Sequence, residues 1–162
     1  MTSHPLVVLM GVAGSGKSTV GPRLAAVLGV PFVDGDDVHS DAAKAQMATG
    51  RPLDDSARGP WLDRLHQILT DHVETGIVVA CSALKGDYRQ RLTGELADVR
   101  YVALVAPAAV LEARLAARPD HFAGPDLLPS QLEHLELSPD VVIVDSTQPI
   151  AAVTEAARTA VL

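Results

Sequence analysis

The segment LMGVAGSGKSTVG, residues 9–21, constrains the fold more than any other part of the chain. It contains the pattern G-x-x-x-x-G-K-[ST] at residues 11–18, directly after the apolar run 6–10 and directly before a helical pattern. The glycines let the backbone curl so that several N–H groups point at one phosphate oxygen. The N-terminus of the following helix attracts the same anion. A strand, a phosphate-binding loop (P-loop) and a helix are therefore predicted in that order.

The chemistry of this motif predicts that the chain binds ATP together with Mg²⁺. Lys17 is expected to bridge the β- and γ-phosphates, and the hydroxyl of Ser18 is expected to hold the metal ion. A glycine-rich turn with an accidental lysine is the weaker interpretation, because the complete motif lies between a strand and a helix. The residues expected to contact the nucleotide here are Gly11, Ala13, Gly14, Ser15, Gly16, Lys17, Ser18 and Thr19.

Short apolar runs alternate with helical patterns along the rest of the chain. The runs are nearly continuous, which is typical of parallel strands covered on both faces, so an α/β fold with right-handed crossovers is predicted. The strands are predicted at 6–10, 31–33, 77–81, 99–105 and 141–144, and helices at 17–28, 60–73, 85–96, 108–118, 127–137 and 149–162. The polar stretches 34–60 and 118–130 fit neither pattern, and we expect a substrate-binding segment and a lid there.

Composition limits the partners of this chain. Its 162 residues suit one domain, 1–162, and a hydrophobic content of 48% supplies a sizeable core. The net charge of −7 argues against nucleic acid as a partner. No apolar run is long enough to span a bilayer, and the N-terminus lacks the pattern of a signal peptide. We expect a cytoplasmic protein that acts on a small molecule, with no nucleic-acid or membrane partner and, with Cys81 alone, no internal disulfide.

A cluster of polar residues, VDGDDVHS (33–40), follows the second predicted strand. One carboxylate at this place can orient water on Mg²⁺, and another can accept the proton of an attacking hydroxyl. An Asp that caps a helix is the competing interpretation, and it suits Asp37 best. For Asp34 and Asp36 we favour function, because the P-loop fixes the geometry nearby. His39 is a candidate substrate contact, although a His at a helix start is more often structural.

Several basic residues are candidates for binding an anionic substrate. Arg58 lies near the start of the predicted helix 60–73, where a cation opposes the helix dipole, so it pairs either with a substrate carboxylate or with Asp54 or Asp55. Lys85 and Arg89 follow the third predicted strand, four residues apart, and form either a solvated basic face or an anion site.

Arg114 and Arg118 form another basic pair, and they lead into the stretch 118–130. Lid arginines can reach the transferring phosphoryl group and spread its charge. The alternative is a pair of surface arginines with one of them bridged to Glu112 or Asp120. We favour the lid, because its closure also excludes water from the reaction.

Taken together, these segments resemble the gluconate kinases, which are small P-loop sugar-acid kinases related to shikimate kinase. The resemblance covers nearly the whole chain and is most specific at 47–62 and 81–89. The matching segments are LMGVAGSGKST (9–19), DGDDVH (34–39), MATGRPLDDSARGPWL (47–62), CSALKGDYRQRL (81–92), EARLAARPDHF (112–122) and VDSTQP (144–149). It implies a three-layer α/β/α fold with a five-stranded parallel sheet in the order 2-3-1-4-5, a lid insertion and commonly a homodimer.

The resemblance also implies an activity, the ATP-dependent phosphorylation of D-gluconate at its C6 hydroxyl. It implies that Asp36 is the base for this hydroxyl and that Asp34 holds Mg²⁺ through water. The residues that match basic or lid positions around substrate and phosphate are Arg58, Lys85, Arg89, Arg114, Arg118 and His121, with Arg118 in a catalytic role. The alternatives are a kinase for another small anionic acceptor, such as shikimate or a different sugar acid, and a non-catalytic nucleotide-binding switch.

Overall fold

A five-stranded parallel sheet forms the centre of the computed structural model, which describes residues 4–49, 55–117 and 128–162. Its strands are β1 (Leu6–Met10), β2 (Phe32–Asp34), β3 (Ile77–Ala80), β4 (Val99–Val105) and β5 (Val141–Asp145). They lie in the order β2-β3-β1-β4-β5, which confirms the expected topology. Each strand differs from its predicted range by at most one residue at an end, because continuous apolar runs flanked by polar residues mark buried parallel strands sharply.

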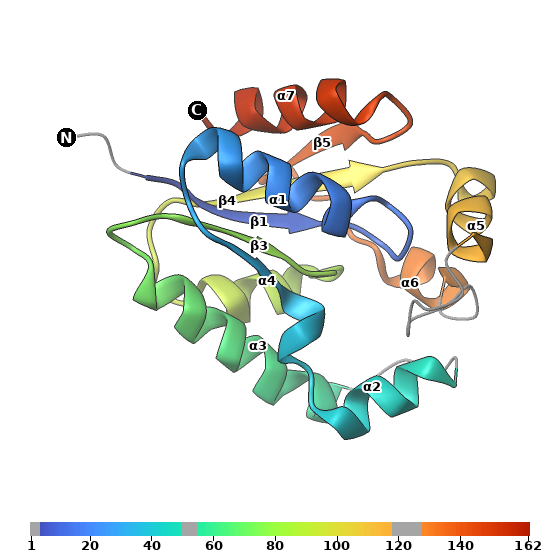
Figure 1. Cartoon of the computed structure of the whole chain (residues 1–162). Helices are drawn as coiled ribbons and strands as arrows, with labels where there is room; N and C mark the ends of the chain where they lie inside the picture. The colour runs from blue at the N-terminus through green and yellow to red at the C-terminus, as the bar shows by residue number, and fades with distance from the viewer. Residues whose placement is uncertain (1–3, 50–54, 118–127) are drawn as a thin grey trace.

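Helices cover both faces of the sheet, as Figure 1 shows. Successive residues of β1 point to opposite faces, so Val7 and Leu9 pack against α1 (Lys17–Leu28) and α7 (Ile150–Val161). Leu6, Val8 and Met10 face the other layer, which contains α3 (Asp55–Asp71) and α4 (Gly86–Thr93). The helices α5 (Ala108–Ala116) and α6 (Leu128–His134) lie beyond the carboxyl ends of the strands (Figure 1).

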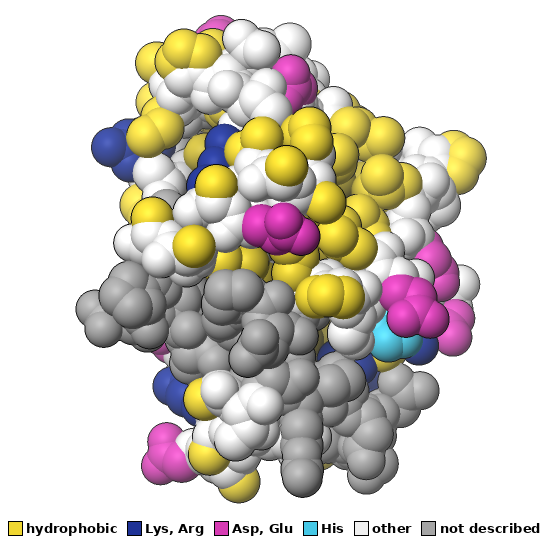
Figure 2. All heavy atoms as spheres, turned by 90° about the vertical axis from the view of Figure 1, so that its right-hand side faces the viewer, with side chains coloured by type: hydrophobic (Ala, Val, Ile, Leu, Met, Phe, Trp, Pro, Cys, Tyr) yellow, Lys and Arg dark blue, Asp and Glu magenta, His cyan; other side chains and the backbone are white. Residues whose placement is uncertain are grey.

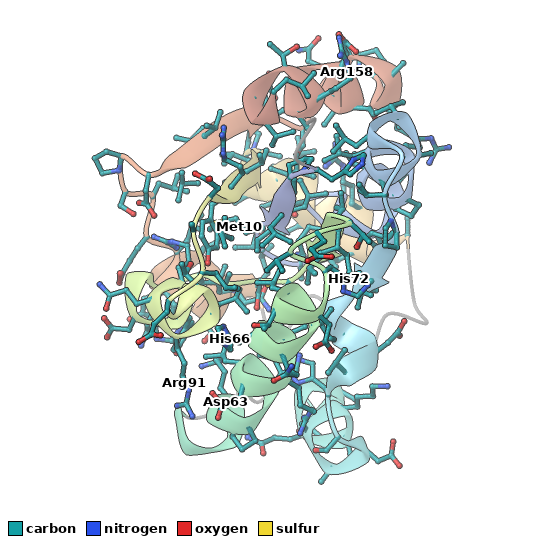
Figure 3. All side chains as sticks on the ribbon, turned by 90° about the vertical axis from the view of Figure 1, so that its left-hand side faces the viewer. Met10, Asp63, His66, His72, Arg91 and Arg158 are labelled. Atoms are coloured by element: carbon teal, nitrogen blue, oxygen red, sulfur yellow. The ribbon has the colours of Figure 1, made fainter. Side chains whose placement is uncertain are left out.

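Polar contacts fix α3 against α4. Arg91 on α4 donates two hydrogen bonds to the Asp63 carboxylate on α3, of 2.8 and 2.9 Å. One turn further along α3, the His66 Nδ1 lies 2.9 Å from the Leu92 carbonyl oxygen. Figure 3 shows Asp63 and Arg91 pointing toward each other from the two helices. These contacts join α3 to the C-terminal end of α4.

The polar stretch 34–60 contains more regular structure than the sequence predicts. A 3-10 helix η1 (Gly35–Val38) follows β2, then α2 (Asp41–Ala48), and α3 begins at Asp55, before the predicted start at residue 60. The signal for α2 is Ser40, whose Oγ accepts a hydrogen bond from the Ala43 N–H at 3.1 Å and so caps the helix N-terminus. None of the helices that the structure describes is long and apolar enough to cross a bilayer.

Candidate active site

The loop between β1 and α1 has the geometry that its glycines predict. Gly14 and Gly16 have φ values of +83° and +104°, a region that side chains with a Cβ rarely adopt. Gly11 has a φ of +149° and is also required by close approach, since a Cβ there would lie 2.6 Å from Ser15 Oγ and 2.8 Å from the Leu104 carbonyl oxygen. The loop is therefore a rigid backbone cradle that opens at the carboxyl end of the sheet.

Lys17 lies against the cradle itself. Its Nζ donates hydrogen bonds to the carbonyl oxygens of Gly11 at 2.7 Å and Val12 at 3.1 Å. Burial lowers the pKa of this ammonium, and the negative charges of Asp36 and Asp34 act in the opposite direction. A cation held at this place faces the phosphate chain of any nucleotide in the cradle.

Ser18 and Asp34 meet beside the cradle. Ser18 Oγ donates to Asp34 Oδ2 at 3.0 Å, while Asp34 Oδ1 accepts from the Asp36 N–H at 3.0 Å and caps η1. The N-cap role expected for Asp37 thus belongs to Asp34, and Asp37 is exposed. One hydroxyl and one carboxylate suit Mg²⁺, which keeps several waters and binds phosphate oxygens. The described residues contain no cluster of three or more His, Cys, Asp or Glu that could hold a metal by themselves.

Asp36 is the carboxylate with the most unusual environment. Burial raises its pKa to about 6, Lys17 opposes the shift, and the neighbouring Asp34 and Asp37 add to it. A carboxylate that titrates near 6 remains ionised at neutral pH and is a better proton acceptor than an ordinary Asp. Asp36 can therefore serve as a general base next to the P-loop lysine.

Arg58 and Lys85 come together over one aromatic ring. Arg58 donates to the Tyr88 hydroxyl at 2.5 Å and its guanidinium carbon lies 4.6 Å from the centre of the Tyr88 ring. Lys85 Nζ lies 5.5 Å from the same centre. Two cations that converge from α3 and from the loop before α4 can pair with a carboxylate. Tyr88 is a member of this group that the sequence reasoning did not identify.

Arg89 is separated from Lys85, although the two were predicted to share a face. Only 3% of Arg89 is exposed, and its guanidinium donates to the carbonyl oxygens of Ala83 at 2.9 Å and Leu84 at 3.1 Å. A further hydrogen bond of 2.9 Å reaches Ser138 Oγ. Arg89 holds the loop after β3 in shape, including Ala83 with its φ of +42°.

His39 is buried, with 8% of its surface exposed. Its ring stacks on Trp61 with the centroids 4.2 Å apart, and Trp61 Nε1 donates to the Gly35 carbonyl oxygen at 2.8 Å. Burial lowers the pKa of His39 to about 4, with Arg58 and other cations acting in the same direction, so the ring is neutral. The stack supports η1, on which Asp36 lies.

Arg114 reaches from α5 toward the P-loop. Its guanidinium donates to the carbonyl oxygens of Gly14 at 3.2 Å and Ser146 at 2.6 Å. It therefore ties the cradle to the turn between β5 and α7. Arg118 and His121 lie outside the described residues, as do residues 118–127 of the predicted lid 118–130. Residues 128–130, the end of that stretch, form the start of α6.

A cavity of about 220 Å³ lies beside the P-loop on the side of α7. The sequence analysis did not identify the two lining residues from the β5–α7 turn, Ser146 and Gln148, as part of the site. The polar run DSTQP (145–149) at the end of the predicted strand 141–144 was an available signal. Asp145 orders this turn by accepting from the Thr147 N–H at 2.9 Å. Figure 2 looks onto the end of the molecule toward which the strands of the sheet point. The lining residues of the cavity are Ser15, Gly16, Thr19, Val20, Arg114, Ser146, Gln148, Ile150 and Val153.

Comparison with known proteins shows which proteins this chain is similar to. A family model described as "AAA domain" matches residues 6–136. The gluconokinase of Gluconobacter oxydans is 43% identical over 136 residues, which are 83% of this chain and 76% of that protein. The thermosensitive gluconokinase of Escherichia coli is 41% identical over 162 residues, with coverages of 96% and 86%.

Solved structures give the same result. A gluconokinase from Sinorhizobium meliloti superimposes with a TM-score of 0.87 at 36% identity, covering 99% of this chain and 93% of that one. A sugar kinase from a Janibacter species superimposes with a TM-score of 0.90 at 37% identity, covering 96% and 93%. The similarity thus extends beyond the P-loop to nearly the whole chain.

Proposed function

The chain belongs to the gluconokinase family of P-loop kinases, and on this premise we propose that its site transfers the γ-phosphoryl group of ATP to the C6 hydroxyl of D-gluconate. The products are 6-phospho-D-gluconate and ADP. The observation that carries the proposal is Asp36, a carboxylate with a pKa of about 6 that interacts electrostatically with the P-loop lysine, Lys17. A base at this place can take the proton of a hydroxyl that attacks the γ-phosphorus.

The donor half binds the phosphates of ATP. Backbone N–H groups of the cradle and the Lys17 ammonium receive the β- and γ-phosphates, and the adjoining cavity of about 220 Å³ accepts the nucleoside. Ser18 and, through water, Asp34 hold Mg²⁺, which when bound neutralises charge on the phosphates. Arg114 keeps the cradle aligned with the β5–α7 turn.

The acceptor half binds the sugar acid. Arg58 and Lys85, converging over Tyr88, pair with the gluconate carboxylate at one end of the acceptor. Asp36 lies toward the phosphates, so the hydroxyl at the other end of the acceptor is the one that meets the base. Arg89 and His39, both buried, act as supports of this half, Arg89 for the loop before α4 and His39 for η1.

The remaining features follow from the family resemblance. Arg118 and His121 contribute from the lid, where Arg118 stabilises the transferring phosphoryl group. The enzyme acts in the cytoplasm and forms a homodimer. Val142 and Ile143 on the edge strand β5, 44% and 56% exposed, support the dimer because exposed apolar residues on an open sheet edge favour association.

The test of this function is an ADP-release assay with Mg-ATP and a panel of acceptors: D-gluconate, epimers of gluconate, shikimate and a neutral hexose. Turnover that depends on gluconate is expected. Turnover with shikimate or another sugar acid instead would assign the site to a different anionic acceptor. ATP binding without turnover on any acceptor would favour a nucleotide-binding switch and contradict the proposal.

The role of Asp36 is tested by Asp36→Asn, with the exposed neighbour Asp37→Asn as the matched control. We expect the Asp36 variant to lose about 10²- to 10⁴-fold in kcat, the usual contribution of a general base, with ATP affinity changed less than about twofold. Asp37→Asn should remain close to wild type. Full activity in Asp36→Asn would remove this residue from the mechanism.

A further inference from the structure

We propose that segment 131–136, which we call the α6 bridge, is a positioning element that holds the P-loop at a fixed place relative to the loop before α4. The first observation is a long-range hydrogen bond at the P-loop end. The Ala13 N–H donates to Gln131 Oε1 at 2.6 Å, between residues 118 positions apart. Because the partner is an N–H donor, the Gln131 amide must present its oxygen to the P-loop. This inference rests on the proposed function, because it concerns transfer to gluconate.

The other end of the α6 bridge is hydrogen-bonded to the loop before α4. The Glu136 N–H donates to the Leu84 carbonyl oxygen at 2.8 Å, and Glu136 Oε1 accepts from the Gly86 N–H at 3.0 Å. These two bonds flank Lys85, one of the two cations that converge over Tyr88. The position of Lys85 is thereby fixed through the same short segment that contacts Ala13.

Apolar packing joins the two ends. A separate buried cluster contains Val12 and Ala13 from the P-loop and Leu84 from the loop before α4, together with Leu128 at the start of α6. Leu132 and Leu135 of the bridge pack against it. Figure 1 shows α6 at the carboxyl end of the sheet, near the P-loop turn. The bridge thus has polar contacts at both ends and a hydrophobic contact between them, as a rigid spacer requires.

Rigid spacing between these loops has a chemical consequence. Phosphoryl transfer needs the acceptor hydroxyl in line with the γ-phosphate, and a misplacement of about 1 Å is enough to cost roughly 10²-fold in rate. Hydrolysis of ATP by water does not depend on where Lys85 holds the acceptor. Loss of the bridge should therefore reduce transfer to gluconate selectively and leave hydrolysis nearly unchanged.

The first test compares Gln131→Met, which keeps the length of the side chain, with Glu133→Ala, an exposed position on the same helix. We expect Gln131→Met to lower kcat for gluconate about tenfold, as for the loss of one net hydrogen bond, with acceptor-free ATP hydrolysis changed less than about twofold. Glu133→Ala should change neither rate. Equal loss of both rates, or no loss in Gln131→Met, would overturn the proposal.

A double-mutant cycle tests whether the two ends act as one unit. Glu136→Ala removes the acceptor for Gly86, and Glu136→Gln retains one, so the Gln variant should recover most of the activity that the Ala variant loses. If the bridge is one spacer, Gln131→Met adds little to Glu136→Ala. Fully multiplicative effects on kcat would show two independent contacts and contradict the proposal.

A final measurement does not involve gluconate. Binding of a non-hydrolysable ATP analogue should slow amide hydrogen exchange in residues 81–88 of the wild type, and Gln131→Met should lose this protection. Retained protection in the variant would overturn the inference whatever the acceptor is. A wild type that does not phosphorylate gluconate, but shows the bridge-dependent protection, would instead contradict only the proposed function.

Discussion

The two halves of the site are built in different ways. The phosphate-binding part of the donor half is a single continuous run, residues 11–19, whose backbone N–H groups are oriented by glycine. The acceptor half takes side chains from separate elements, with Asp36 on η1, Arg58 on α3 and Lys85 before α4. A site made from contiguous backbone is specified locally, whereas a site made from dispersed side chains depends on how the sheet and helices pack.

The two halves interact electrostatically through one pair of opposite charges, Lys17 and Asp36. Lys17 is a cation whose pKa burial lowers, and Asp36 is an anion whose pKa burial raises. Each stabilises the charged form of the other, so each half depends on the charge of its neighbour. Substitutions in one half therefore show whether the division between phosphate binding and acceptor binding is real.

The largest effect should come from removing the donor cation. Lys17→Ala is expected to lower kcat about 10³-fold or more and to weaken ATP binding as well, because the ammonium faces the phosphates in both ground and transition states. Isothermal titration with ATP and steady-state kinetics measure the two effects. Arg23→Ala, an exposed cation on the same helix, is the control and should bind ATP normally. Unchanged ATP binding in Lys17→Ala would contradict the P-loop assignment.

An intermediate effect is expected from the acceptor half. Arg58→Gln should raise KM for gluconate about 10- to 100-fold, as expected for the loss of a charge-assisted pair, while KM for ATP changes less than about twofold. The matched control is Arg91→Gln, which removes a cation from the exposed pair with Asp63. An equal rise in both KM values would mean that the halves are not separable.

The smallest effect is a dependence on pH. With a pKa of about 6 for Asp36, kcat/KM for gluconate should fall up to tenfold for each pH unit below about 6, because the protonated carboxyl cannot act as a base. A profile without an acid limb between pH 4 and 6 would show that Asp36 ionisation does not limit the reaction.

Asp36 should also make the stability of the folded state depend on pH. The pKa of Asp36 is higher in the folded chain, about 6, than its ordinary 3.8, so its stabilising contribution is complete below 3.8 and is lost as pH rises through 6. Asp36→Asn should therefore raise Tm relative to the wild type at pH 8, by roughly 5 °C, and by much less at pH 4. Thermal scans at the two pH values measure this difference.

Sequence reasoning succeeded where residues act through local geometry. The strands are confirmed, and so is the strand–loop–helix context of the P-loop. The sheet order, which the resemblance to the gluconate kinases implied, is confirmed as well. It failed for α2, where the capping Ser40 was overlooked within a polar stretch. It also grouped Lys85 with Arg89, because i, i+4 spacing on a helix predicts a shared face, yet Lys85 precedes α4 and Arg89 is turned into the protein.

The sequence by itself determined the phosphate cradle, the parallel sheet and the carboxylates at the end of β2, because each is encoded in a short run of neighbouring residues. Only the tertiary structure decided that Arg58 and Lys85 meet over Tyr88, that Arg114 braces the P-loop, and that Gln131 bonds to Ala13. These pairs lie far apart in the chain. Their contacts exist because parallel strands bring their carboxyl ends, and the loops that follow, to one edge of the sheet.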